Sequence, residues 1–450
     1  MSTALIILGA GMGTRMNSEL PKVLHPIGGA PMLVHAMRAG EALTPEKTVI
    51  VAGHGAEAVR KAALAYDPEA QTVLQTEQLG TAHAVAQARS ALDDFDGDAI
   101  VLYGDTPFIR AETLEAMAEA RNAHDVVVLG FEAADPGRYG RLITQGDALE
   151  RIVEFKDATD EERAVTLCNS GVVAAKSSVL FDLVAAVGND NAAGEYYLTD
   201  IIGIARSRGL SATVVRCAEA ETLGVNSRAE LIAAEADFQA RARAAAIEDG
   251  VTLLAPQTVF FAYDTYLGRD AIIEQNVVFG PHVTVESGAR IRAFSHLEGC
   301  HVSQGATVGP YARLRPGAEL QENVHVGNFV EIKNAIVAEG AKVNHLTYIG
   351  DADIGARTNI GAGTITCNYD GVFKHRTVIG EDAFIGSNTM LVAPVTVGHQ
   401  AMTASGSVIT RDVPDGALGV ARARQENKAG FAVRMFDKLK NLKAKQVKDQ

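Results

Sequence analysis

The sequence lacks several features that would place the chain in well-defined classes of protein. Its cysteines, Cys168, Cys217, Cys300 and Cys367, lie far apart without a C-x-x-C pair, which indicates reduced thiols rather than a disulfide framework. No apolar run approaches the roughly 18 residues that a membrane-spanning helix needs. The early apolar run Ala4–Leu8 is short and ends in glycines, so no signal peptide is expected. We therefore expect a cytoplasmic protein with no membrane partner.

Positive charge is also scarce. The formal net charge is −14, whereas a general nucleic-acid binder would be basic, so no nucleic-acid partner is expected. An anionic substrate would have to be held by local donors against this overall charge. The exception is a C-terminal group of lysines, which fits a solvated end better than a phosphate-binding role: Lys438, Lys440, Lys443, Lys445 and Lys448.

The second half of the chain repeats every six residues. Aliphatic or aromatic residues recur at this step, as in the run Ile273, Phe279, Val285, Ile291 and Leu297. A helix has a period near 3.6 and a strand a period of 2, so neither explains this step. Six residues make one flat side of a solenoid coil, with the aliphatic residue inside and a small residue at the corner. The pattern predicts a parallel β-helix from about residue 252 to 412.

One interval in this repeat is irregular. Ile360 and Ile379 are 19 residues apart, one more than three six-residue steps. This spacing predicts a loop that leaves the coil between them. Such loops are a common way for a coil stack to build a binding site at its edge.

The first half alternates short apolar runs with helical patterns, which is typical of βαβ units and predicts a doubly wound α/β domain. Ligands of such sheets bind beyond the carboxyl ends of the strands. Ser227 and Glu230 have the spacing of a capping box, which predicts the start of a connecting helix. The expected strands are 4–8, 48–52, 99–103, 126–130 and 171–174, with a helix at 112–123; the expected domains are 1–226, a helical linker at 227–250, and 251–450.

The first expected strand runs into a glycine-rich segment, Gly9-Ala-Gly11-Met-Gly13-Thr-Arg15. Glycines let the backbone approach a pyrophosphate, and successive N–H groups bind anions. The spacing G-x-G-x-G is not the dinucleotide-binding G-x-G-x-x-G, and no G-K-[ST] follows. Arg15 and Lys22 are cations that could neutralise charge on a triphosphate, which favours phosphoryl-type transfer.

Three further segments fit this chemistry. Gln75 and Gly80-Thr81 offer an amide and a close-approaching backbone for a base edge. Asp105 follows an expected strand, where a carboxylate can hold Mg²⁺ against phosphate oxygens, and Asn226 could supply a second oxygen ligand. Taken singly, Asp105 fits a turn residue equally well.

The motif LGAGMGTRMNSELPKVLHPIGG resembles the signature of sugar-1-phosphate nucleotidyltransferases. With QTEQLGTAHA, YGDTP, GRYGRL, VEFKDA, NSG and GVNSR in this order, the chain resembles the bifunctional family that joins N-acetylglucosamine-1-phosphate uridyltransferase to glucosamine-1-phosphate N-acetyltransferase. The segment NHLTYIGDADIGARTNIGAGTITCNYDG resembles the acetyltransferase half. The resemblance extends to about residue 425. It implies a Rossmann-like nucleotidyltransferase domain, a left-handed β-helix, and a homotrimer.

The resemblance also implies roles for individual residues in uridyl transfer. Arg15 and Lys22 would be catalytic, and Asp105 and Asn226 would ligate Mg²⁺. The family more often has alanine where this chain has Gly9, a difference that should not weaken a backbone contact. The residues expected to bind UTP and UDP-N-acetylglucosamine are Leu8, Gly9, Ala10, Gly11, Lys22, Gln75, Gly80, Thr81, Tyr103, Gly104, Asp105, Gly140, Glu154, Asn169 and Asn226.

For acetyl transfer the resemblance implies that His345 is the general base, a role that the ordinary pKa of histidine near 6.5 suits. Glucosamine-1-phosphate is the expected acceptor, and acetyl-CoA the donor. Ser405 departs from the small apolar residue expected at its position. The residues expected to bind glucosamine-1-phosphate are Arg315, Lys333, Tyr348 and Asn359; those expected to bind acetyl-CoA are Ala362, Asn368, Tyr369, Ser387, Ser405 and Arg422.

Two other hypotheses remain at this stage. The repeat domain could serve only regulation or oligomerisation, which the presence of His345, Arg315 and the Asn368-Tyr369 pair disfavours. A non-catalytic scaffold would be expected to lack the charged residues of the glycine segment, whereas Arg15, Lys22 and Asp105 are present. The favoured hypothesis is an enzyme that makes UDP-N-acetylglucosamine for peptidoglycan and lipopolysaccharide precursors.

Overall fold

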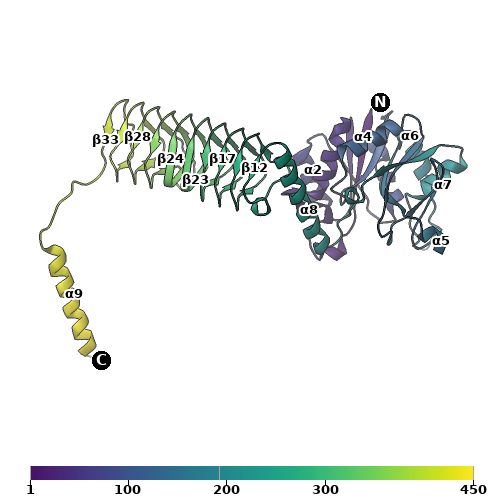
Figure 1. Ribbon diagram of the computed structural model, residues 1–450, viewed down its shortest axis with the longest axis horizontal. Helices are drawn as coiled ribbons and strands as arrows, with labels where there is room; N and C mark the ends of the chain where they lie inside the picture. Colours follow the sequence, from purple (N-terminus) through teal and green to yellow (C-terminus); the bar gives the residue numbers. More distant parts are fainter. Residues whose placement is uncertain (1, 192, 449–450) are drawn as a thin grey trace. The chain divides into compact units, whose positions relative to one another are not determined.

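The computed structural model describes residues 2–191 and 193–448. The chain divides into two compact units. The first comprises Met1–Ala246 with Phe260–Thr265, and the second comprises Ile247–Val259 with Tyr266–Gln450. Each unit contains its own large sheet (Figure 1). The chain therefore has one mixed α/β unit and one unit made largely of short strands.

The first unit is built on a nine-stranded sheet in the order β5-β4-β1-β6-β10-β7-β11-β9-β8. Strand β1 pairs in parallel with β4 and β6, whereas β10 runs antiparallel between β6 and β7. All five strands predicted from apolar runs are present, in a sheet that is mixed at β10 rather than uniformly parallel. The strands are β1 Thr3–Gly9, β4 Lys47–Ala52, β5 Gln71–Leu74, β6 Asp98–Tyr103, β7 Val126–Glu132, β8 Arg141–Gln145, β9 Ala148–Val153, β10 Leu167–Lys176 and β11 Ala212–Cys217, with a small hairpin of β2 Pro26–Ile27 and β3 Ala30–Pro31.

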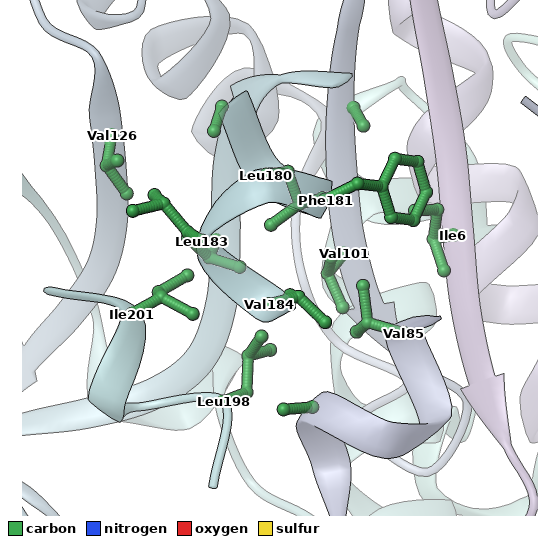
Figure 2. Packing of buried hydrophobic residues seen from close by; sticks show 14 of the residues in the cluster. Ile6, Val85, Val101, Val126, Leu180, Phe181, Leu183, Val184, Leu198 and Ile201 are labelled. Carbon is green, nitrogen blue, oxygen red and sulfur yellow. The ribbon is translucent and has the colours of Figure 1, made fainter. Parts of the chain in front are cut away.

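Helices cover both faces of this sheet. In β1, Ile6 and Leu8 face a core shared with α3, α6 and α7, while Leu5 and Ile7 face a second core shared with α1, α2 and α4. Figure 2 shows the first of these cores, where Phe181 and Val101 lie near Ile6. The buried aliphatic run of β1 is explained by this double coverage. The helices are α1 Met32–Gly40, α2 Ala56–Tyr66, α3 Thr81–Gln87, α4 Ala111–Ala120, α5 Asp160–Arg163, α6 Ser177–Val184 and α7 Asp200–Ser207.

The strand register brings the candidate loops together. Leu8 of β1 lies opposite Tyr103 of β6, and Gly9 lies opposite Ala52 of β4. The loops that follow these parallel strands therefore leave the sheet at the same edge. This is where an open α/β sheet holds its ligand.

Helix α8, Arg228–Glu248, begins with the predicted capping box. The Ser227 hydroxyl accepts a hydrogen bond from the Glu230 backbone N–H at 3.3 Å, and the Glu230 carboxylate accepts one from the Ser227 N–H at 3.0 Å. Leu231, Ala234 and Phe238 of α8 pack against a small apolar cluster of the first unit that contains Ile27, Met32, Phe108 and Val225. The helix expected as a connection is thus packed on the first unit over much of its length.

In the second unit, each short strand pairs in parallel with the strand about three further along the chain. The strands are β12 Thr252–Leu253, β13 Tyr266–Leu267, β14 Ile272–Ile273, β15 Val278–Phe279, β16 Val283–Val285, β17 Arg290–Ile291, β18 His296–Leu297, β19 Cys300–Val302, β20 Thr307–Val308, β21 Arg313–Leu314, β22 Ala318–Leu320, β23 His325–Val337, β24 Lys342–Ile354, β25 Asn359–Ile360, β26 Ile365–Cys367, β27 Thr377–Ile379, β28 Phe384–Ile385, β29 Met390–Val392, β30 Val395–Val397, β31 Met402–Thr403, β32 Val408–Ile409 and β33 Leu418–Gly419. Figure 1 shows them as a regular stack, called here the strand stack.

The six-residue repeat sets the register of the strand stack. Ile272 lies opposite Arg290, and Phe279 lies opposite Leu297, in each case a step of 18 residues. The repeating aliphatic side chains are buried; Ile291, Leu297 and Val308 are all 0% exposed. From Ala352 to Thr377 the step grows to 25 residues, so the extruded loop exists and is longer than the sequence spacing predicted.

A last helix, α9 Phe431–Lys448, carries the lysine-rich end. Its described side chains are exposed, as a solvated C-terminal segment would be. Within residues 2–191 and 193–448, no helix combines the length and apolarity required to cross a bilayer.

Candidate active sites

A cleft of about 330 Å³ opens at the carboxyl edge of the nine-stranded sheet. Most of the residues predicted to bind the nucleotide line it, among them the backbone of the glycine segment and the start of α3. The volume lies within the usual range of about 300–1,000 Å³ for small-ligand sites. The lining residues are Leu8, Gly9, Ala10, Gly11, Lys22, Val23, Gln75, Gln78, Gly80, Thr81, Ala84, Tyr103, Asp105 and Glu195.

The glycines of this segment differ in what they contribute. A Cβ on Gly9 would lie 3.5 Å from Val23 and the Val51 carbonyl, an ordinary contact, so alanine fits there as the sequence suggested. Gly13 has φ 61°, and a Cβ on it would lie 2.7 Å from the Cβ of Lys22. Gly13 is therefore the residue that lets Lys22 pack against the segment.

Lys22 joins the two expected metal ligands. Its ammonium forms an ion pair with the Asp105 carboxylate and donates a 3.0 Å hydrogen bond to Oδ1 of Asn226. The loops that carry these oxygens are tied together, because the Val225 N–H donates to the Asp105 carbonyl at 2.9 Å. A carboxylate oxygen of Asp105 and the amide oxygen of Asn226 thus both contact the Lys22 ammonium. This pair of oxygen donors suits a divalent cation such as Mg²⁺.

Gln75 and Gly80 form a fixed wall of the cleft. The Gln75 side chain is 6% exposed and donates to the Gly80 carbonyl at 3.2 Å. Gly80 has φ 112°, and a Cβ on it would lie 2.6 Å from the Tyr196 carbonyl. Only glycine fits this contact, which places the first turn of α3 beside the cleft.

A second cleft of about 480 Å³ lies beside the first and shares Thr81, Tyr103 and Glu195 with it. Asn169 and Glu154 line it, as expected for the sugar end of the ligand. Burial raises the pKa of Glu154, and Oε1 of that carboxylate accepts a 3.2 Å hydrogen bond from the Thr199 hydroxyl. Gly140 lies next to this cleft, because its carbonyl accepts from the Asn169 N–H at 2.9 Å.

The structure places one predicted residue apart and adds several others. Arg15 lies on a short 3₁₀ turn, Thr14–Met16, with an exposed side chain, and does not line either cleft. Gln78 was not predicted, although it lies within the quoted motif QTEQLG; its amide donates to the Ala10 carbonyl at 2.9 Å. Glu195, Tyr197 and Thr199 come from a segment that carried no recognisable pattern.

In the second unit, the predicted sugar-phosphate residues lie on neighbouring levels of the strand stack. The two longest strands, β23 and β24, pair in parallel and carry Lys333 and Tyr348. Arg315 lies on the neighbouring level, because its backbone N–H donates to the carbonyl of Ile332, the residue before Lys333. Its side chain forms an ion pair with Glu331 at 2.8 Å. The structure thus brings two cations into adjacent positions, where a phosphate could bind.

Tyr348 and Asn368 meet across Gly350. A Cβ on Gly350 would lie 2.4 Å from the Tyr348 hydroxyl oxygen and 2.7 Å from Nδ2 of Asn368. The absence of a side chain at Gly350 therefore makes room for both. Nothing in the repeat pattern had marked this glycine.

His345 begins a second line of predicted residues that runs along the strand stack. The His345 carbonyl accepts a hydrogen bond from the N–H of Gly363, the residue after Ala362. The Ala362 carbonyl in turn accepts one from the N–H of Asn388, the residue after Ser387. The Ser387 carbonyl accepts from Gly406, beside Ser405, and a Cβ on Gly406 would lie 4.0 Å from Arg422. The expected general base is thus aligned with the expected acetyl-CoA residues. Asn359 lies opposite Lys342 on the next level.

The extruded loop begins at Asn368 and returns at His375, whose N–H donates to the Asn368 carbonyl at 2.9 Å. Asp370 closes it by accepting from the N–H groups of Val372 and Phe373 and from the His375 ring. The His375 contact is the main cause of the pKa of Asp370 falling to about 2. Tyr369 is 56% exposed at the tip, with the Lys374 ammonium 4.2 Å from its ring centre.

A glycine-rich cleft with paired oxygen donors at the carboxyl edge of an α/β sheet is typical of a nucleotidyltransferase, and the second unit has a polar site of its own. The model of the MobA-like NTP transferase domain family matches residues 5–169, and that of the GMPPB C-terminal domain matches residues 296–413. The chain is 70% identical over 448 residues to Bifunctional protein GlmU of Ruegeria sp. (strain TM1040), covering 100% of both chains. It is 71% identical over 436 residues to that of Cereibacter sphaeroides (strain ATCC 17025 / ATH 2.4.3), covering 97% of this chain and 96% of the relative.

The chain therefore belongs to the GlmU family. It is a bifunctional transferase, with nucleotidyltransferase and acetyltransferase activities that together make UDP-N-acetylglucosamine for peptidoglycan and cell-wall synthesis. Its substrates are small molecules of the sugar-phosphate and nucleotide classes, and membership of the family implies the use of a divalent metal and acetyl-CoA.

Proposed function

We propose that the two reactions occupy separate sites, uridyl transfer in residues 1–226 and acetyl transfer in 251–450, with 227–250 between them. Glucosamine-1-phosphate is acetylated first, and the resulting N-acetylglucosamine-1-phosphate then reacts with UTP. The observation that carries this proposal is that each unit has its own set of polar residues, around Lys22 and Asp105 in the first and on β23, β24 and their neighbouring strands in the second.

In the first unit, the glycine segment would bind the triphosphate through backbone N–H groups, while Gln75 and Gly80 hold the base. A phosphate oxygen of the sugar attacks the α-phosphorus of UTP in line, the new P–O bond forms as the bond to the leaving group breaks, and pyrophosphate departs. Lys22 would stabilise the charge that spreads over the transferring group, and Arg15 of the glycine segment would be a second cation. Glu154 and Asn169 would hold the sugar.

Asp105 and Asn226 would hold Mg²⁺, and the ion when bound would neutralise phosphate charge. Support comes from the two oxygens that converge on the Lys22 ammonium. Replacement Asp105→Ala should lower the rate of uridyl transfer by at least about a hundredfold at saturating Mg²⁺, because both the metal and the Lys22 ammonium lose their carboxylate partner. Acetyl transfer by the same preparation is the control for folding. Uridyl transfer at the wild-type rate would refute the assignment.

In the second unit, Arg315 and Lys333 would bind the phosphate of glucosamine-1-phosphate, and Tyr348 and Asn359 its sugar. Ala362, Asn368, Tyr369, Ser387, Ser405 and Arg422 would bind acetyl-CoA. The sugar amine attacks the thioester carbonyl and gives a proton to His345; the C–S bond breaks as the amide forms, and CoA leaves as a thiolate that takes the proton back from His345. No cysteine is needed, and both substrates would be bound at once.

The test of this site is His345→Ala, assayed with glucosamine-1-phosphate and acetyl-CoA. General-base catalysis contributes about 10²–10⁴-fold, so a loss of that size is expected, with uridyl transfer unchanged. Lys333→Ala should instead raise KM for the sugar phosphate, because the Lys333 side chain is assigned to binding. Acetylation at the wild-type rate by the His345 variant would remove the histidine from the mechanism.

The strand stack is proposed to be a left-handed parallel β-helix that assembles as a homotrimer in the cytoplasm. Support for the coil comes from the parallel pairing of most strands with the strand three further along the chain. Support for a partner copy comes from an exposed aromatic column: Phe294 stacks on Tyr311 with ring centres 4.8 Å apart, and Tyr311 on Phe329 at 5.4 Å. Sedimentation of Tyr311→Glu tests this, since a charge in the column should dissociate the trimer.

A further inference from the structure

Three side chains form a hydrogen-bonded column at one corner of the strand stack, beside the proposed acetyl-transfer site. Asn334, Asp351 and Asn368 occupy this corner on successive levels, 17 residues apart. Nδ2 of Asn334 donates to one oxygen of the Asp351 carboxylate at 2.5 Å, and Nδ2 of Asn368 donates to the other oxygen. Asn334 and Asp351 both have positive φ, 45° and 50°, as corner residues of the coil.

The carboxylate at the centre of this column is held by amides. Asp351 is 8% exposed and Asn368 is 5% exposed. The nearby Arg376 makes its ion pair with Asp353 instead. A buried carboxylate that lacks a direct salt bridge is costly unless hydrogen bonds satisfy both of its oxygens, and the two asparagines do so.

This arrangement determines which end of the Asn368 amide faces outward. A carboxylate only accepts hydrogen bonds, so Asn368 must turn its NH₂ group toward Asp351 and its Oδ1 away. The two ends of an asparagine amide have nearly the same shape, and only hydrogen bonding distinguishes them. Across residues 2–191 and 193–448, no side-chain or backbone donor is found on the Oδ1 of Asn368.

We propose that Asp351 is a positioning residue for acetyl transfer. It fixes the Asn368 amide so that Oδ1 is presented as an acceptor to an N–H group of the bound substrates, either the pantetheine amides or the sugar amine. This inference rests on the proposed function, because it takes Asn368 as a residue of the acetyl-transfer site. Asn368 also begins the extruded loop and lies close to Tyr348 at Gly350. The orientation of its amide therefore affects the proposed acetyl-transfer site.

The test begins with Asp351→Asn, which keeps the shape but makes the column a chain of three amides. Such a chain can run in either direction, so part of the population would present the NH₂ of Asn368 to the substrates. Loss of one buried hydrogen bond to a ligand predicts about a tenfold lower kcat/KM for acetyl-CoA. Uridyl transfer by the same protein should be unchanged, which shows that the first unit is intact, and a melting curve compared with wild type shows whether the second unit is folded.

The deciding variant is the double replacement Asn334→Asp with Asp351→Asn. The carboxylate at position 334 accepts from the amide at 351, whose oxygen then accepts from Nδ2 of Asn368. The direction of the column is restored, so kcat/KM for acetyl-CoA should recover to within about threefold of wild type. A merely structural role for Asp351 would not produce this recovery. Asn334→Ala keeps the contact between Asp351 and Asn368 and is the matched control; its stability should fall, because one oxygen of Asp351 loses its amide donor, while kcat/KM for acetyl-CoA stays near the wild-type value.

Three results would overturn the inference, and they are distinguishable. Wild-type kinetics in Asp351→Asn, with Asn368→Ala impaired, would refute the positioning role alone. Impairment of Asp351→Asn with no recovery in the double variant would indicate general loss of packing. Wild-type kinetics in Asn368→Ala would refute the proposed site and the inference with it. If Asp351→Asn unfolds the second unit, the double variant decides, since it must both fold and acetylate.

Discussion

Nδ1 of His345 lies 2.9 Å from Oδ1 of Asn328, which faces it in register across β23 and β24. An amide oxygen accepts hydrogen bonds, so with this orientation the ring carries its proton on Nδ1. The other nitrogen, Nε2, is then left with a lone pair that can take a proton from an amine. Asn328 thereby selects the tautomer that a general base requires.

Replacement Asn328→Ala should therefore lower kcat for acetyl transfer. Without the amide oxygen the imidazole can adopt the other tautomer or rotate, and about a tenfold loss is expected, smaller than the loss for His345→Ala. KM for the sugar phosphate should change little, because Arg315 and Lys333 are untouched. A kcat equal to that of the wild type would show that Asn328 does not orient the base.

The glycine segment offers a matched pair of variants. Gly9→Ala should leave uridyl transfer within about twofold of wild type, because the added methyl meets ordinary contacts. Gly13→Ala combines a φ of 61° with a 2.7 Å contact to Lys22, so it should displace that lysine and lower uridyl transfer at least tenfold. Steady-state kinetics with UTP compare the two. Equal activities would contradict the role given to Gly13.

Glu154 gives a prediction about pH. Burial raises the pKa of its carboxyl, so the folded state holds this proton at pH values where the unfolded chain has lost it. The free energy of unfolding should fall as the pH rises from the ordinary pKa of glutamate through the raised value. Glu154→Gln removes this dependence. Melting curves should show the variant equal to wild type near pH 4 and more stable near pH 7; a difference independent of pH would contradict the burial effect.

Gly350 should be intolerant of even one added carbon. Gly350→Ala would push against the Tyr348 hydroxyl and the Asn368 amide, and acetyl transfer should fall at least tenfold. Gly280→Ala is a control within the same strand stack, because its new methyl meets the flexible side chain of Glu298 at 3.1 Å. Acetyl-transfer kinetics and melting curves of both variants separate a local effect from unfolding of the second unit. Similar acetyl-transfer rates in the two variants would refute the steric account.

Local pattern was enough to predict much of the fold. The apolar run of β1 and the six-residue repeat both mark side chains that are buried on folding. The spacing of apolar residues therefore predicts these elements directly. The sequence did not predict that β10 runs antiparallel, since an apolar run has no direction of pairing. The sequence also underestimated the length of the extruded loop. The spacing of 19 between Ile360 and Ile379 looks close to three regular steps, although part of this segment lies outside the strand stack.

The candidate sites were predictable where motifs bring residues together at one strand end. Asp105 and Asn226 were named from such motifs and do converge on Lys22. Arg15 was named for its charge, yet its side chain is exposed beyond the cleft. Asn328 and Asp351 could not be predicted, because an isolated polar residue in a six-residue repeat is ordinarily solvated. Only the register across neighbouring levels reveals their partners.

The central claim is that one chain carries two independent sites, and a mixing experiment tests it most directly. Asp105→Ala and His345→Ala are assayed singly and together with glucosamine-1-phosphate, acetyl-CoA, UTP and Mg²⁺. Each variant alone should form almost no UDP-N-acetylglucosamine, the first stopping at N-acetylglucosamine-1-phosphate and the second at the unacetylated sugar. The mixture should restore the product. Failure of the mixture, with both variants folded, would contradict the account.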